Sequence, residues 1–136
     1  MTDWVDAYSG QFENTYLHSD TQSSSYLIVG GTSNPMKGVS GSIFEGKEYS
    51  TDTAGVHYLD RPVGIKPTGP EAVGAFWYDQ RKGAADGHEY HAVQFPSETY
   101  AGTQTHKAFH LADEMGVFNK RSDRADFFAS ILSWME

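Results

Sequence analysis

Histidines are the residues of this chain whose spacing most directly suggests chemistry. His106 and His110 are four residues apart, and on a helix two residues at that spacing lie on the same face. Neutral imidazoles are good ligands for divalent metals, so two of them that converge from one helix can hold a single ion. We therefore treat His106 and His110 as candidate metal ligands.

A second histidine group lies shortly before this pair. In the segment 88–91 (HEYH), a strand would place Glu89 and His91 on one face. If that strand packs beside the helix, Glu89 and His91 would join His106 and His110 in a site of two or three histidines and one carboxylate. The alternative interpretation is that these histidines pair with surface carboxylates and bind nothing, in which case no cofactor is expected.

Large aromatic residues mark both ends of the chain. Trp4 and Tyr8 lie near the N-terminus and Trp134 near the C-terminus. Two terminal helices packed side by side would expose these rings as an aromatic groove, a surface that suits a proline-rich peptide. In the alternative interpretation both tryptophans seal the hydrophobic core.

The chain combines an N-terminal segment with Trp4 and Tyr8, a central β region, a turn at 81–87 (RKGAADG) and an amphipathic C-terminal helix. In this combination it resembles the profilin family. The resemblance implies an α+β fold, and it implies binding to actin or to proline-rich peptides as a further functional alternative.

Composition and charge exclude several classes of protein. The chain has 136 residues, contains no cysteine and carries a formal net charge of -8. Without cysteine there is no disulfide, thiolate catalysis, zinc finger or iron–sulfur cluster. The acidic balance disfavours nucleic acid and anionic membrane surfaces as partners, because both attract clustered Lys and Arg. It favours a protein partner with a basic surface.

The length and the N-terminal sequence bear on domain number and location. A chain of 136 residues is typical of one domain, which we place over 1–136. The N-terminal sequence MTDW lacks the basic start and apolar stretch of a secretory signal, so we expect a cytoplasmic protein. With 3 Trp, 8 Tyr and 8 Phe, aromatic rings are expected to supply a core that few aliphatic residues could build.

The middle of the chain indicates strands. Short apolar segments predict strands at 25–29 and at 88–95, the second ended by Pro96. Weak β character extends over 38–59, where Lys47 and Glu48 are expected to flank a hairpin turn, and 60–70 is expected to be an extended connection. Residues 70–82 fit a helix that begins at Pro70, although Gly74 and the aromatic run after it leave a strand open.

Helices are predicted at both ends. An N-terminal helix would carry Trp4, Val5, Tyr8 and Phe12 behind a Thr2 cap. A helix over 105–116 is predicted from apolar residues at i, i+3, i+4 and i+7, namely Ala108, Leu111, Ala112 and Met115. A final helix from Ser122 or Asp123 to the end carries one apolar stripe: Phe127, Phe128, Ile131, Leu132 and Met135. The fold class is therefore α+β, a single domain with a central, mostly antiparallel sheet on which N-terminal and C-terminal helices pack.

These observations favour a small acidic binding or inhibitor-type module over an enzyme. Its aromatic residues, with Trp4, Tyr8 and Trp134 foremost, would anchor a basic protein partner. The alternative is a small enzyme that uses a His/carboxylate site, with or without a divalent metal. The sequence identifies no catalytic residues for it.

Overall fold

Two antiparallel sheets and one long helix make up the described part of the protein. The computed structural model describes residues 12–25, 35–50, 63–78, 90–103, 106–112, 118 and 120–136. In chain order the elements are the π-helical turn η1 (Glu13–Leu17), β1 (Ser19–Ser25), β2 (Met36–Gly38), β3 (Glu48–Tyr49), β4 (Val63–Pro67), β5 (Val73–Tyr78), β6 (Ala92–Phe95), β7 (Ala108–Leu111) and α2 (Arg121–Met135). One sheet has the order β3-β2-β5-β6-β7 and the other pairs β1 with β4.

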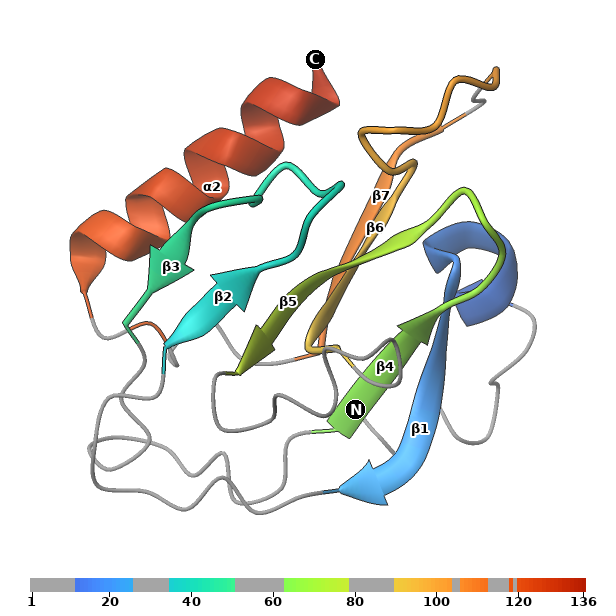
Figure 1. Ribbon diagram of the computed structural model, residues 1–136, viewed down its shortest axis with the longest axis horizontal. Helices are drawn as coiled ribbons and strands as arrows, with labels where there is room; N and C mark the ends of the chain where they lie inside the picture. The colour runs from blue at the N-terminus through green and yellow to red at the C-terminus, as the bar shows by residue number, and fades with distance from the viewer. Residues whose placement is uncertain are drawn as a thin grey trace.

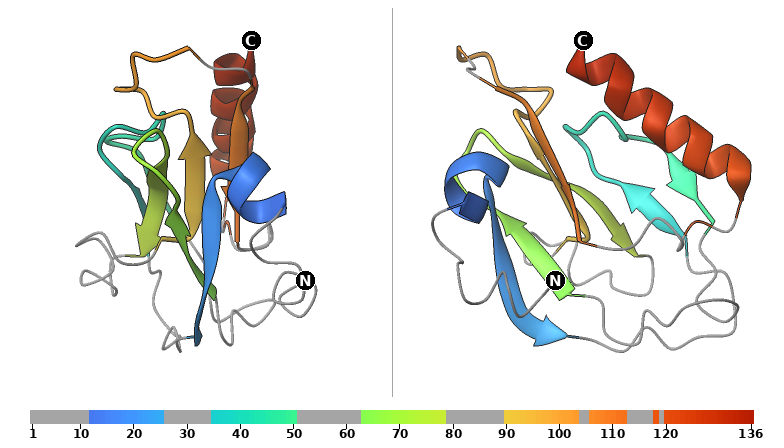
Figure 2. Two further views of the ribbon diagram at one scale, coloured as in Figure 1. Left: turned by 90° about the vertical axis from the view of Figure 1, so that its right-hand side faces the viewer. Right: turned by 180° about the vertical axis from the view of Figure 1, so that it is seen from behind.

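The helix and the smaller sheet lie at different ends of the larger sheet. Figures 1 and 2 show α2 beside β3 and β2, whereas β1, β4 and η1 lie toward the opposite end. An antiparallel bridge between Ile65 and Tyr90 joins the smaller sheet to the segment that leads into β6. The predicted α+β class is thus confirmed, with antiparallel sheets and a C-terminal helix.

Strand β6 separates two hydrophobic clusters, because successive residues of a strand point to opposite faces. Ala92 belongs to a cluster that includes Phe127 of α2. Val93 and Phe95 belong to a second cluster with Ile65 of β4. All four residues of β6 are buried, as expected for a strand covered on both faces.

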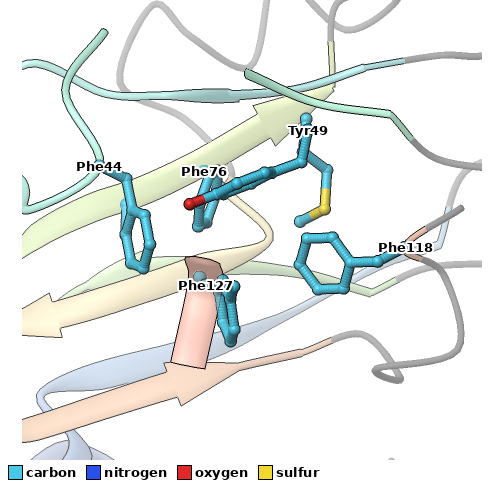
Figure 3. Close-up of a cluster of buried hydrophobic side chains, with 8 residues drawn as sticks. Phe44, Tyr49, Phe76, Phe118 and Phe127 are labelled. Carbon is cyan, nitrogen blue, oxygen red and sulfur yellow. The ribbon is translucent and has the colours of Figure 1, made fainter. Parts of the chain in front are cut away.

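The first cluster is built from aromatic rings, as the composition predicts. Five of its eight buried members are aromatic: Phe44, Tyr49, Phe76, Phe118 and Phe127. Figure 3 shows these rings converging from the turn after β2, from β3, from β5 and from α2. The ring of Phe127 stacks on Phe44 at 5.2 Å and lies 5.0 Å from Phe118. Each buried ring of this size contributes about 1.5–3 kcal/mol by leaving water, so Phe127 is the main apolar attachment of α2.

Polar contacts fix α2 at the rim of this cluster. Lys47 Nζ donates to Asp126 Oδ2 at 2.8 Å and to Ser130 Oγ at 2.7 Å. One turn earlier, the amide of Ser50 donates to Asp123 Oδ2 at 3.1 Å. These bonds hold the helix against the end of the β2–β3 hairpin. The antiparallel pairing of β2 with β3, with Lys37 opposite Glu48, confirms that Lys47 and Glu48 lie beside a hairpin turn.

The hairpin turn depends on close backbone approach. A Cβ at Gly38 would lie 1.7 Å from the carbonyl oxygen of Phe44, so no larger residue fits there. Buried Gln94 of β6 supports the same turn, since its Oε1 accepts a hydrogen bond from the amide of Ile43 at 2.9 Å. Its Nε2 donates to the carbonyl of Pro96 at 2.9 Å.

The helix predicted over 105–116 is wrong where the structure describes it. Residues 108–111 form β7, which pairs with β6 in the register Ala92↔Leu111 to Phe95↔Ala108. Ala108 packs in the second cluster and Leu111 against the first, so these residues face opposite sides of a sheet. Both faces of β7 contact apolar neighbours. A strand of this kind does not alternate between apolar and polar residues, so its sequence is hard to distinguish from that of a helix.

The other predicted helices and strands agree with the structure only in part. The helix beginning at Pro70 is wrong, since Val73–Tyr78 form β5, the alternative left open. The extended connection over 60–70 contains strand β4. The strand over 88–95 is confirmed for Ala92–Phe95, with a cis Phe95–Pro96 bond after it. The N-terminal helix at Trp4–Tyr8 and residues 26–29 of the predicted strand at 25–29 lie outside the described residues.

The C-terminal helix is confirmed as α2, but its apolar stripe divides between two faces. Phe127 is buried and Ile131 is half-buried against the first cluster. Phe128, Leu132 and Met135 are exposed. In the part of the chain that the structure describes, no helix has the length and apolar character needed to cross a membrane.

Candidate functional site

A row of five rings runs from the surface at η1 into the second hydrophobic cluster. The aromatic row consists of Phe12, Tyr16, His106, His18 and Phe95. Phe12 and Tyr16 lie 5.4 Å apart and are 51% and 56% exposed. At the other end Phe95 is buried. The row therefore presents two rings to solvent on a support that reaches the core.

The inner members of the row stack on one another. The His18 ring lies 3.5 Å from the Phe95 ring at an interplanar angle of 11°, and 5.3 Å from the His106 ring. His106 lies 5.0 Å from Phe95 and 6.5 Å from Tyr16. His106 thus contacts rings on both the buried and the exposed side.

Backbone contacts position the outer rings. The ring nitrogen Nε2 of His106 lies 3.1 Å from the carbonyl oxygen of Tyr16, within hydrogen-bond distance. The carbonyl of His18 accepts a hydrogen bond from the amide of Thr68 at 2.8 Å. His18 has a φ of 52°, in the left-handed region that only a few non-glycine residues adopt. This backbone turn directs the chain from η1 into β1.

The electrostatic environment favours a neutral imidazole at His18. Burial, and secondly the neighbouring His106, lower the pKa of His18 below its ordinary 6.5, while Glu71 opposes this shift. Two stacked imidazoles that were both protonated would repel each other. We therefore expect the stacking of these rings to be most stable at pH values at which His18 is uncharged.

The predicted metal ligands His106 and His110 contact different groups. His110 is paired across the sheet with Val93, and its Nδ1 lies 2.8 Å from Ser19 Oγ of β1. His106 belongs to the aromatic row. The helix expected to bring the two imidazoles onto one face is not formed where the structure describes this segment, because His110 lies in β7 and His106 lies two residues before that strand.

Of the two remaining residues of the predicted metal site, the structure describes one. His91 is fully buried, directly before β6. Glu89 lies outside the described residues. Among the residues that the structure describes, no three His, Asp or Glu side chains are grouped so as to hold a metal ion. The four-residue site remains a prediction, because Glu89 is part of it.

Of the predicted aromatic anchors, the structure describes Trp134 alone. Trp134 is half-buried on α2, with Lys107 Nζ 5.4 Å from the centre of its ring. Lys107 also donates a hydrogen bond to the carbonyl oxygen of Trp134. One face of this ring is therefore already occupied by a cation of the chain itself. Trp4 and Tyr8 lie outside the described ranges, so the expected groove between terminal helices is untested.

Sequence reasoning missed most of the aromatic row. The sequence pattern places Phe12 on the apolar stripe of a helix and does not group Tyr16 or His18 with it. The spacing of Phe12 and Tyr16 offered a clue, since residues four apart are neighbours on a helical turn. The contacts with His106 and Phe95 join segments about 80 to 90 positions apart, and no local pattern encodes them.

No protein-family model, characterised protein or solved structure matches this chain in the comparisons made with it. The resemblance to profilin therefore rests on the short sequence stretches alone and stays a prediction.

Proposed function

We propose that this protein is a binding module, without catalytic activity of its own, that engages a basic protein partner through aromatic side chains. The observation that carries this proposal is the pair of rings at Phe12 and Tyr16. Both are half exposed, they lie 5.4 Å apart, and the rest of the aromatic row supports them from behind. Tyr, Trp and Phe are enriched in protein interfaces, and Tyr is among the residues that carry most of the binding energy there.

The chemistry of these rings favours a cationic group on the partner. The face of Phe or Tyr attracts a guanidinium or ammonium group with about 0.5–1 kcal/mol at an exposed site and about 2 kcal/mol or more once desolvated. The contact between His106 and the carbonyl of Tyr16 restricts the turn that carries both rings. A restricted turn loses less conformational entropy on binding, which strengthens the association.

The charge of the chain favours the same class of partner. A net charge of -8 accelerates encounter with a basic protein, and salt weakens that acceleration. Such a module acts as an inhibitor wherever the bound basic surface includes the partner's own functional site. The aromatic row supplies the short-range contact and the overall charge supplies the long-range attraction.

A labelled arginine-rich peptide and a copy with glutamine at each arginine test the proposal by fluorescence anisotropy. The arginine peptide should bind and the glutamine peptide should not. Replacing both outer rings, Phe12→Ala with Tyr16→Ala, should weaken binding about tenfold, since losing the two contacts costs roughly 1–2 kcal/mol. Salt at about 1 M, where the screening length is roughly 3 Å, should weaken it further.

Tyr100→Ala is the matched control, because Tyr100 is also an exposed aromatic residue but lies outside the row. It should leave the affinity unchanged. Absence of binding by the arginine peptide would contradict the proposal. So would equal affinity of the double variant and the control.

A further inference from the structure

The outer face of α2 carries an apolar stripe that nothing in the described structure covers. Phe128, Leu132 and Met135 are 49%, 64% and 42% exposed. Ala125 continues the line toward the start of the helix and is also exposed. The successive spacings of three, four and three residues are those of the contact seam of a coiled coil.

The part of α2 from Phe127 to Met135, which carries three of the four stripe residues, is free of charge. Between Asp126 and Glu136 the sequence FFASILSWM contains no ionisable side chain. The inward side of the same stretch is occupied, since Phe127 packs in the first cluster and Ser130 accepts a hydrogen bond from Lys47. A contiguous exposed apolar patch bordered by polar residues marks an interaction surface in a soluble domain.

We propose that this face is the interface between two copies of the chain, with α2 of one copy packed antiparallel to α2 of the other. The stripe is complementary to itself when it is turned end for end. Phe128 then lies opposite Leu132 of the second copy, and small Ala125 lies opposite the larger Met135. A twofold interface needs this property, because every contact in it occurs twice with the roles exchanged.

The charges at the helix ends select the antiparallel arrangement. Arg121 is exposed in the first turn and Glu136 is exposed after the last. Each is unfavourable in its own helix, whose N-terminus is partly positive and whose C-terminus is partly negative. An antiparallel pair brings Arg121 of one copy to the end where Glu136 of the other lies, whereas a parallel pair would place like charges together.

This inference is independent of the proposed function, because it uses a different surface. Figures 1 and 2 show α2 toward the end of the sheet away from η1, and the stripe shares no residue with the aromatic row. One helix of 15 residues offers a small interface, and small interfaces are weak. The dimer is therefore expected to form reversibly as concentration rises.

Sedimentation equilibrium over about 10–500 µM, a range that covers weak interfaces, measures the association. The mass of the unmodified chain should rise from 15.1 kDa toward twice that value. Leu132→Glu should remain monomeric, because it places a carboxylate at the centre of the stripe. Ser133→Glu, also exposed and on the same helix, adds the same charge beside the stripe and should still associate.

Crosslinking tests the orientation, and the absence of cysteine makes it selective. Ala129 lies beside the middle of the stripe, so antiparallel packing brings the two copies of this position face to face. Ala129→Cys should therefore give a covalent dimer with a short bismaleimide. Ser133→Cys, which points away from the seam, should give little.

Ala129 and Ser133 are both exposed, so each cysteine variant should retain the circular dichroism spectrum of the unmodified chain. A mass that stays at 15.1 kDa at every concentration would overturn the interface. Association of Leu132→Glu as strong as that of Ser133→Glu would do the same. A dimer that crosslinks no better in the Ala129→Cys variant than in the Ser133→Cys variant would overturn the antiparallel arrangement.

Discussion

The phenol of Tyr49 donates a 2.6 Å hydrogen bond to Asp126 Oδ2 and thereby joins β3 to α2. Tyr49 is buried in the aromatic cluster, whereas Asp126 lies at the surface. Burial, and secondly the bond to Asp126, raise the pKa of Tyr49 well above its ordinary 10. In turn Lys47 and then Tyr49 lower the pKa of Asp126 below 3.8. The bond thus links the core to the polar rim of the helix.

A double-mutant cycle with Tyr49→Phe and Asp126→Ala should show that these two side chains are coupled. Tyr49→Phe keeps the ring in place and removes the hydroxyl. A hydrogen bond of this kind contributes about 1 kcal/mol to the free energy of unfolding. Because Asp126 is exposed to solvent, we expect the coupling energy between the two side chains not to exceed that value. Urea unfolding at neutral pH measures the cycle.

The matched control for this cycle is Asp123→Ala. Asp123 accepts a bond from the amide of Ser50 and should show less coupling to Tyr49→Phe. The contribution of Asp126 is present above pH 3.8 and is lost as the pH falls through its lowered folded-state pKa. Additive effects of Tyr49→Phe and Asp126→Ala at neutral pH would contradict the link.

Gly74→Ala should destabilise the protein by about 1–3 kcal/mol, the usual cost of overpacking. A Cβ at Gly74 would lie 2.2 Å from Cγ of Tyr90 and almost as close to both Cδ atoms. These atoms form the base of a buried ring and cannot swing away as the tip of a flexible side chain can. Thermal unfolding checks the effect, and Tyr90→Leu should lessen the additional cost of the alanine. An unchanged melting temperature for Gly74→Ala would show that the ring does not approach this backbone.

The unfolding free energy should fall as the pH is lowered below 6.5, in part because of His18. The folded-state pKa of His18 lies below the ordinary value of 6.5, so the unfolded chain binds its proton first. The stability linked to this group is therefore present above pH 6.5 and is lost as the pH falls through the lowered folded-state pKa. Urea unfolding at several pH values measures the slope.

His18→Asn isolates this contribution, since asparagine tolerates the left-handed backbone at this position. The variant should show a shallower loss of stability with falling pH than the unmodified chain. Tyr100→Ala, which removes an exposed side chain outside the aromatic row, should keep the steeper dependence. Identical pH slopes for the unmodified chain and His18→Asn would contradict the lowered pKa.

The sequence predicted the C-terminal helix because its period is local, but it did not predict which apolar residues that helix buries. Phe127 and Phe128 are adjacent, so they point about 100° apart. Only the position of the sheet decides that Phe127 enters the core while Phe128 stays outside. The aromatic content likewise predicted what the core is made of, without predicting which segments meet in it.

Strand β7 shows why the candidate site could not be read from the sequence. The spacing of Ala108 and Leu111 fits one face of a helix, yet pairing with β6 places them on opposite faces of a sheet. With that change His106 lies in the aromatic row, while the metal site that includes it remains a prediction. The deciding contacts come from His18 and Phe95, which no spacing around His106 reveals.

The measurement that tests the proposed function most directly is a nuclear magnetic resonance titration of the labelled protein with the arginine-rich peptide. We expect the largest chemical-shift changes at Phe12, Tyr16 and His106, with little change along the exposed face of α2. Changes centred on Leu132 and its neighbours, or no localised changes at all, would contradict the assignment of the aromatic row as the partner-binding surface.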